Sequence, residues 1–123
     1  MNKLLFGIAI IAFAGCNYEM HEKAVDHKLS VQVQTFYNEN KYDSIFSMYS
    51  QSMRESFPLD KTVAFFVEVK ARSGKMTSIQ FEKYKDNWAC YKVTCERYQC
   101  IMKIAAGKNG DIAGLAITGP LHE

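Results

Sequence analysis

The chain has 123 residues, of which 15 are basic and 13 acidic, so its formal net charge is +2. A chain of this length supports one domain with one modest hydrophobic core. The charge is nearly balanced, and no basic stripe with interleaved aromatic residues occurs. We therefore do not expect the protein to bind nucleic acid.

The first 15 residues have the order of a secretory signal peptide. Lys3 precedes an apolar run over 4–13, and small residues follow. As a helix rising ~1.5 Å per residue, this run is roughly 15 Å long. The hydrocarbon core of a bilayer is about 30 Å thick, so the run is too short to span it.

Ala14, Gly15 and Cys16 resemble the lipobox of bacterial lipoproteins, although Phe13 departs from the usual aliphatic residue. The resemblance implies that Cys16 becomes the lipidated first residue of the mature protein. Cleavage by ordinary signal peptidase, leaving a free thiol, is the alternative. Asn17 is not acidic, which favours the outer membrane in a cell envelope with two membranes. We therefore divide the chain into a signal peptide (1–15), a lipidated tether (16–23) and one domain (24–123).

The first half of the domain has the apolar periodicity of helices. Residues 24–37 carry one apolar stripe, 42–54 resume it after a polar break, and 58–72 repeat it. Pro58 suits the first turn of a helix, because a backbone N–H has no helical hydrogen-bond partner there and proline has no N–H. Gly74 is a natural stop. We expect three helices over these ranges.

In the second half of the domain, apolar and polar residues alternate as they do in the strands of an antiparallel sheet. Asn109-Gly110 predicts a hairpin loop. That loop pairs Ile104 with Leu115 and Met102 with Ile117. A loop at Arg97-Tyr98 in the preceding hairpin pairs Val93 with Met102, Tyr91 with Ile104 and Cys95 with Cys100. With a further strand through Ile79 and Phe81, the prediction is an α+β fold: three N-terminal helices packed on a curved antiparallel sheet of about four strands.

Several stretches resemble a bacterial domain family of unknown function in the nuclear-transport-factor-2-like (cystatin-like) superfamily. They are Tyr42–Phe46, Phe57–Thr62, Phe65-Phe66, Asn87–Ala89, Tyr91-Lys92, Glu96-Arg97 and Asn109–Leu115. The resemblance implies a cone, in which a curved sheet wraps a long helix and leaves an apolar pocket at one end. Members often precede a serine hydrolase or α/β-hydrolase domain, which we do not expect in a sequence that ends at Glu123. No catalytic motif of the superfamily can be placed here.

The titratable residues do not form a catalytic or metal-binding pattern. We expect His21, His27 and His122 to be solvated, since no two have a spacing suited to a metal. Structural roles beside turns or at a solvated edge are expected for Glu82, Asp86 and Asp111. We therefore predict no catalytic residue, no metal and no cofactor.

Two states are possible for Cys95 and Cys100: a disulfide across a hairpin, or two reduced thiols in the core. Cys90 stays unpaired in both. A redox or metal role is the minor alternative.

Aromatic residues at helical spacing are either core or the lining of a pocket. The lining we expect consists of Phe36, Tyr42, Phe46, Phe66 and Tyr91. The leading hypothesis is a membrane-anchored envelope lipoprotein, which binds a small apolar ligand, a peptide or a partner protein without catalysis. The alternatives are a small pocket enzyme, a hydrolase or isomerase that uses a buried carboxylate or tyrosine, and a redox sensor acting through Cys95 and Cys100.

Overall fold

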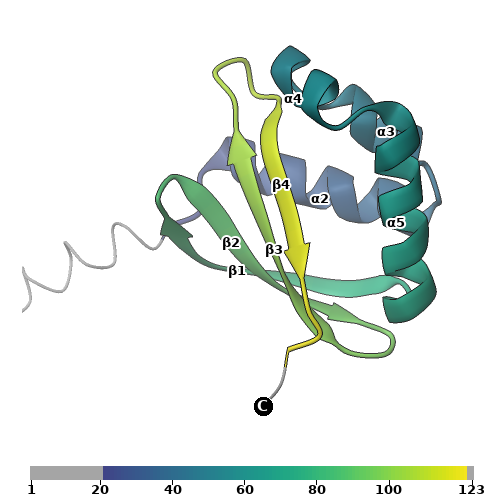
Figure 1. Ribbon diagram of the computed structural model, residues 1–123. Helices are drawn as coiled ribbons and strands as arrows, with labels where there is room; N and C mark the ends of the chain where they lie inside the picture. The colour runs from purple at the N-terminus through teal and green to yellow at the C-terminus, as the bar shows by residue number, and fades with distance from the viewer. Residues whose placement is uncertain (1–20, 122–123) are drawn as a thin grey trace, which may run out of the picture.

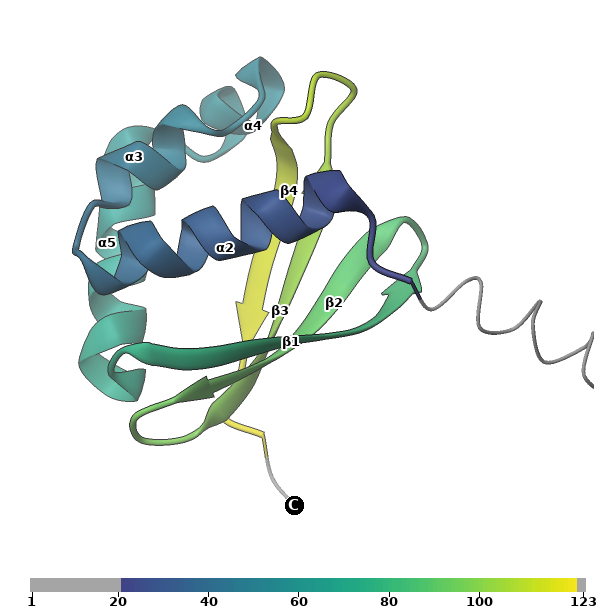
Figure 2. The same ribbon diagram turned by 180° about the vertical axis from the view of Figure 1, so that it is seen from behind.

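The computed structural model describes residues 21–121. Within this range, four helices come before the strands: α2 (Ala24–Asn38), α3 (Tyr42–Ser47), α4 (Gln51–Ser56) and α5 (Leu59–Ser73). Four strands follow: β1 (Met76–Lys85), β2 (Trp88–Cys95), β3 (Gln99–Ala106) and β4 (Ile112–Thr118). They form one antiparallel sheet in the order β1-β2-β3-β4. The sheet curves around α2, and the helices lie on one face (Figures 1 and 2). The predicted α+β architecture is confirmed.

The predicted helix over 42–54 is wrong in one respect, because it is two short helices. Between α3 and α4 the chain leaves the helix to pair with the start of β4. The Ser50 N–H donates to the Ile112 carbonyl at 2.8 Å, and the Ile112 N–H donates to the Met48 carbonyl at 2.8 Å. The Ser50 hydroxyl then accepts from the Met53 N–H and caps α4. Sheet pairing thus replaces the helical hydrogen bonds given up at the break.

The third helix agrees with its prediction to within one residue. Pro58 is the N-cap of α5 instead of its first residue. Gly74 ends the helix with φ 84°, a conformation that glycine adopts without steric cost. The Gly74 carbonyl accepts a bond of 2.8 Å from the buried Tyr37 hydroxyl on α2. This bond joins the two longest helices across the core.

The register of β3 and β4 is confirmed: Ile104 pairs with Leu115, and Met102 with Ile117. The loop between them is longer than the predicted two residues. Ala106 already pairs with Ile112 after a register shift, and the Gly107 N–H donates to the Asp111 carbonyl.

The register of β2 and β3 is two residues away from the prediction. Val93 lies opposite Cys100, Tyr91 opposite Met102, and Ala89 opposite Ile104. A shift of two residues keeps every side chain on its predicted face. The physical reason is tertiary. The loop is Glu96-Arg97, and its N–H groups donate to the carbonyls of Lys75, which follows α5, and Ser73, which ends it.

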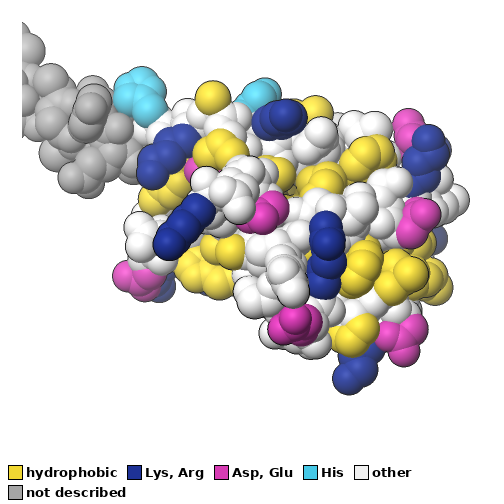
Figure 3. Space-filling model, turned by 90° about the horizontal axis from the view of Figure 1, so that it is seen from above, with side chains coloured by type: hydrophobic (Ala, Val, Ile, Leu, Met, Phe, Trp, Pro, Cys, Tyr) yellow, Lys and Arg dark blue, Asp and Glu magenta, His cyan; other side chains and the backbone are white. Residues whose placement is uncertain are grey.

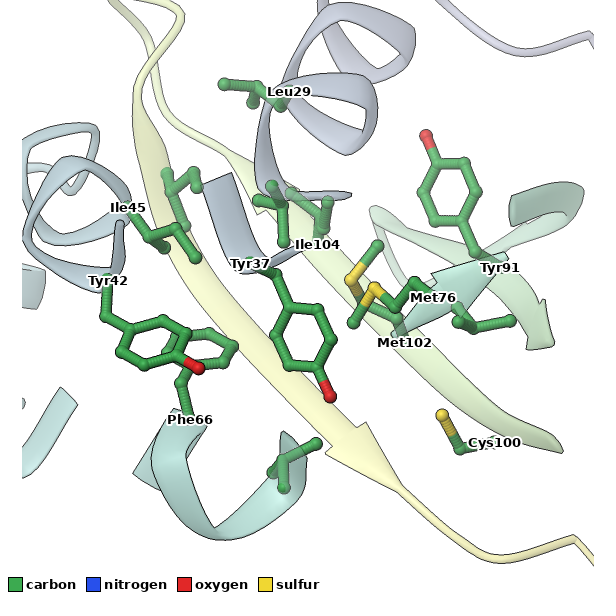
Figure 4. Close-up of a cluster of buried hydrophobic side chains, with 14 of the residues drawn as sticks. Leu29, Tyr37, Tyr42, Ile45, Phe66, Met76, Tyr91, Cys100, Met102 and Ile104 are labelled. Carbon is green, nitrogen blue, oxygen red and sulfur yellow. The ribbon is translucent and has the colours of Figure 1, made fainter. Parts of the chain in front are cut away.

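The core lies between α2, α3, α5 and the inner face of the sheet. In Figure 4 the rings of Tyr42 and Phe66 overlap, with centroids 5.7 Å apart and planes 15° apart. Tyr37 meets the edge of Phe66 at 6.0 Å. Met76 and Met102 fill the space toward the sheet and are fully buried (Figure 4). No helix within residues 21–121 is both long and apolar enough to cross a membrane.

Candidate functional site

An apolar groove lies between the short helix α4, the start of α5 and the last strand β4. Its volume is about 480 Å³, within the range typical of ligand pockets. In the text below, "the β4 groove" denotes the hollow lined by Tyr49, Met53, Ser56, Phe57, Phe65, Leu115, Ala116 and Ile117.

The pairing of the sheet positions one wall of the β4 groove. Leu115 and Ile117 lie opposite Ile104 and Met102, which are completely buried on the inner face. They therefore point toward the helices. Because β4 is the last strand, these side chains stay only half-buried. On the other wall, Phe57 and Phe65 meet edge to face, with centroids 5.9 Å apart.

No lining side chain of the β4 groove carries a charge. The Tyr49 hydroxyl accepts a hydrogen bond from Thr62 Oγ1 at 3.2 Å. Burial raises the pKa of Tyr49, so the phenol is neutral near pH 7. The lining of the groove is therefore suited to contact with apolar groups.

A second region, made of polar groups that bond to one another, lies beside the start of α2. The Tyr84 hydroxyl donates to Asp26 Oδ2 at 2.6 Å and accepts from the Lys23 N–H at 2.7 Å. The Tyr91 hydroxyl donates to Glu22 Oε2 at 2.7 Å. We call these five residues the tether end. Two residues of the predicted tether are thus bonded to strands β1 and β2.

Asp26 is the buried carboxylate of this region, with 4% of its surface exposed. It lies in the first turn of α2, where the helix dipole favours negative charge. Burial first, and then the bond to Asp26, raise the pKa of Tyr84 to about 12. Burial and the bond to Glu22 also raise the pKa of Tyr91. Both phenols therefore stay protonated and act as donors.

None of the five aromatic residues predicted to line a pocket is among the residues that line the β4 groove. Tyr42, Phe66 and Tyr91 are buried in the core, and Phe36 and Phe46 pack against it. Tyr91 lies on β2, and the other four lie on the helices α2, α3 and α5. The β4 groove is lined by other residues.

The three cysteines of the described range carry free, buried thiols. Cys95 and Cys100 do not lie opposite each other: their partners are Met76 on β1 and Val93 on β2. Interaction with the Cys100 thiol first, and then burial, raise the pKa of Cys95, and interaction with the Cys95 thiol lowers the pKa of Cys100. A disulfide between them stays a prediction. On the opposite face of the sheet, the Cys90 thiol donates to the Trp88 carbonyl at 3.8 Å.

The remaining titratable residues are scattered. His21 is exposed, and His27 is exposed and lies 3.2 Å from Glu22. Glu82 and Asp86 are exposed at the β1–β2 hairpin, and Asp111 is in the β3–β4 loop. No group of three possible metal ligands occurs in residues 21–121. Basic and acidic side chains are interspersed over the face seen in Figure 3, with apolar side chains between them.

Asp86 also lines a hollow of about 310 Å³ on the outer face of the sheet, together with Lys85, Trp88, Lys103 and Ala116. The predicted signal peptide (1–15), Cys16 and His122 lie outside the described residues.

Sequence reasoning missed Asp26, Tyr84 and the lining of the β4 groove. An aspartate amid the apolar stripe of α2, next to Val25, was the available signal for a buried carboxylate. The groove had a weaker signal in the run Ile112–Thr118, which contains no charge.

A model of a family described as "Protein of unknown function (DUF3887)" matches residues 30–115. No curated protein and no solved structure is significantly similar to the chain. The match covers more than half of the sequence and extends from α2 into β4. The chain therefore belongs to the DUF3887 family of proteins of unknown function.

Proposed function

We propose that this protein is a lipid-anchored protein of the bacterial cell envelope, and that its domain binds an apolar ligand in the β4 groove without catalysis. The observation that supports binding is the groove itself, which is large, half-exposed and lined without charge. Anchoring rests on the sequence of the leader and on Cys16. The superfamily resemblance supports the proposal, because a helix wrapped by a curved sheet and open at one end suits a ligand.

The lipid anchor is tested at Cys16. Cys16→Ser removes the thiol that accepts the acyl chain, so we expect an uncleaved or mislocalised protein. Labelled palmitate and membrane fractionation measure this. A Cys16→Ser protein with a correctly cleaved N-terminus that stays in the membrane would contradict the anchor. The same fractionation separates outer from inner membrane, of which we propose the outer.

Binding is tested with indole, a small uncharged aromatic probe, added to the full-length chain in lipid nanodiscs. We expect saturable shifts of the methyl signals of Met53, Leu115 and Ile117. Ser56→Trp should weaken binding by about tenfold or more, since an indole ring then occupies the groove. Ser52→Trp is the matched control: it lies on the same helix, is exposed and does not line the groove. Absence of saturable shifts would end the binding proposal.

A pocket enzyme is the second candidate, and the buried carboxylate of Asp26 is the observation in its favour. Asp26 does not line the β4 groove, and its partner Tyr84 holds it in the tether end. The binding proposal is therefore preferred. Turnover of uncharged nitrophenyl esters that disappears in Asp26→Asn would reverse this preference.

A further inference from the structure

The outer edge of β4 is an unused strand edge. β4 is the last strand of the sheet, and β3 occupies its inner edge. On the outer edge, the described part of the chain pairs with Ile112 alone, through Met48 and Ser50. Among residues 21–121, none forms a backbone hydrogen bond to 113–118 on that edge. A row of unpaired backbone donors and acceptors is a template for another strand.

This edge also lacks the usual protection against pairing. Natural edge strands carry lysine, proline or inward-pointing charge, or are covered by another element. The run Ile112–Thr118 has no charged residue and no proline. The parallel bridge between Tyr49 and Ile112 covers its first residue only. That bridge shows that the edge accepts a backbone at this position, within the space beside α4.

The β4 groove runs beside this edge. A smaller hollow adjoins it and shares two lining residues, Phe65 and Ile117. Residues of α5 and β4 contribute to both hollows, and Arg72 and Ser73 make the smaller one partly polar. A strand edge beside an apolar groove satisfies both requirements of strand addition. Backbone bonds supply affinity, and pockets accept alternate side chains.

We propose that the β4 groove binds an extended, uncharged peptide segment, which adds to the sheet as a fifth strand along β4; this inference rests on the proposed function. The shape and charge of the site favour this occupant. The main hollow has no charged lining, so an uncharged segment is its electrostatic match. The helices α4 and α5 form the opposite wall of this hollow. A second copy of this domain would bring its own helices against that wall.

The test uses a capped pentapeptide of alternating valine and serine, which combines strand propensity with a two-residue side-chain repeat. It is added to the full-length chain in lipid nanodiscs. Hydrogen exchange of the β4 amides that do not bond to β3 should slow at saturation. Indole, which has no peptide backbone, should leave this exchange unchanged while it shifts the groove methyl signals.

Two N-methylated isomers of the pentapeptide sharpen the test. One carries methyl groups on the valine nitrogens and the other on the serine nitrogens, and in a strand these two sets point to opposite sides. The isomer methylated on the side facing β4 should bind about tenfold more weakly or worse, and its counterpart should bind like the parent. Ser56→Trp should weaken the parent peptide, and Ser52→Trp should not.

The outcomes separate this inference from the proposed function. Unchanged exchange in β4 at saturating peptide overturns strand addition, whatever the two isomers do. If the methyl signals still respond to indole, the groove remains a ligand site. Failure of both probes contradicts the proposed function as well. A concentration-dependent dimer that protects the β4 amides and excludes the peptide identifies a second copy as the occupant and overturns the inference.

Discussion

The tether end and the β4 groove lie at different places on one sheet. They differ in how far their polar and apolar groups are paired and covered. At the tether end, Tyr84 donates to the buried carboxylate of Asp26 at 2.6 Å, and Tyr91 donates to Glu22 at 2.7 Å. In the described range, no buried side-chain nitrogen or oxygen is left without a partner. The β4 groove has apolar side chains that stay half-exposed and a strand edge that is mostly unpaired.

The difference separates a structural role from a binding role. Buried polar groups that are fully satisfied rigidify a structure, and they have no capacity left for a ligand. Exposed apolar surface beside unpaired backbone gains free energy when another molecule covers it. We therefore assign a structural role to the tether end, and we propose the β4 groove as the site of recognition.

The largest expected effect is at Asp26. Asp26→Ala removes the acceptor of the Tyr84 hydroxyl and should lower the free energy of unfolding by about 2 kcal/mol, the usual range for a hydrogen bond to a charged group. Urea denaturation measures the change. Asp43→Ala is the matched control, since Asp43 is exposed in the first turn of α3, and its effect should stay within about 0.5 kcal/mol. Equal effects at both positions would mean that the tether end is not a stabilising network.

Tyr84→Phe should have about half that effect. It keeps the ring but removes both bonds of the hydroxyl, so we expect a loss of about 1 kcal/mol. In the double variant with Asp26→Ala, the two losses should not add, because each substitution removes the same bond. Fully additive losses in urea denaturation would show that Tyr84 and Asp26 do not act together.

The pH dependence of stability gives a subtler test. The pKa of Tyr84 is about 12 in the folded protein and 10.0 as its reference value. The folded state therefore keeps a proton that the unfolded state loses above pH 10. The contribution of Tyr84 to the free energy of unfolding is therefore fully present below pH 10. It falls as the pH rises from 10 toward 12. Tyr84→Phe should show a shallower fall than the wild-type protein. Parallel curves of urea midpoint against pH would contradict the assignment.

The smallest expected effect is at the groove. Ser56→Trp should change the free energy of unfolding by less than about 0.5 kcal/mol, because Ser56 is exposed and lines an open hollow. The same substitution should abolish most of the indole binding. Thermal unfolding in parallel with the methyl titration measures both quantities. A loss of stability like that of Asp26→Ala would make the groove a structural element instead of a binding site.

Local patterns in the sequence predicted most of the elements and the facing of their side chains. The apolar stripes of α2 and α5 and the stop at Gly74 follow from helical period and backbone freedom, which nearby residues determine. The β3–β4 register follows from the same alternation. The helix over 42–54 was predicted as continuous, because its break depends on Ser50 and Met48 bonding to Ile112, more than 60 positions along the chain.

The candidate site was less predictable than the fold. The aromatic residues expected in a pocket have the spacing of core positions, and the structure buries them in or against the core. Whether an aromatic residue fills the cone or lines its opening depends on which strand ends the sheet. That is a property of topology and not of local pattern. The carboxylate of Asp26 shows the same limit, since its partner Tyr84 is 58 positions away.

By itself, the sequence determined the order of elements and the inward and outward faces of the strands, and it predicts a leader that ends at Cys16. These depend on the periods of helix and strand and on the order of charged, apolar and small residues. Tertiary structure alone decided the β2–β3 register, the bonding of Glu22 and Lys23 to the strands, and the position of the open groove. Each of these depends on hydrogen bonds or packing between distant segments, whose partners become neighbours only after the sheet has closed around α2.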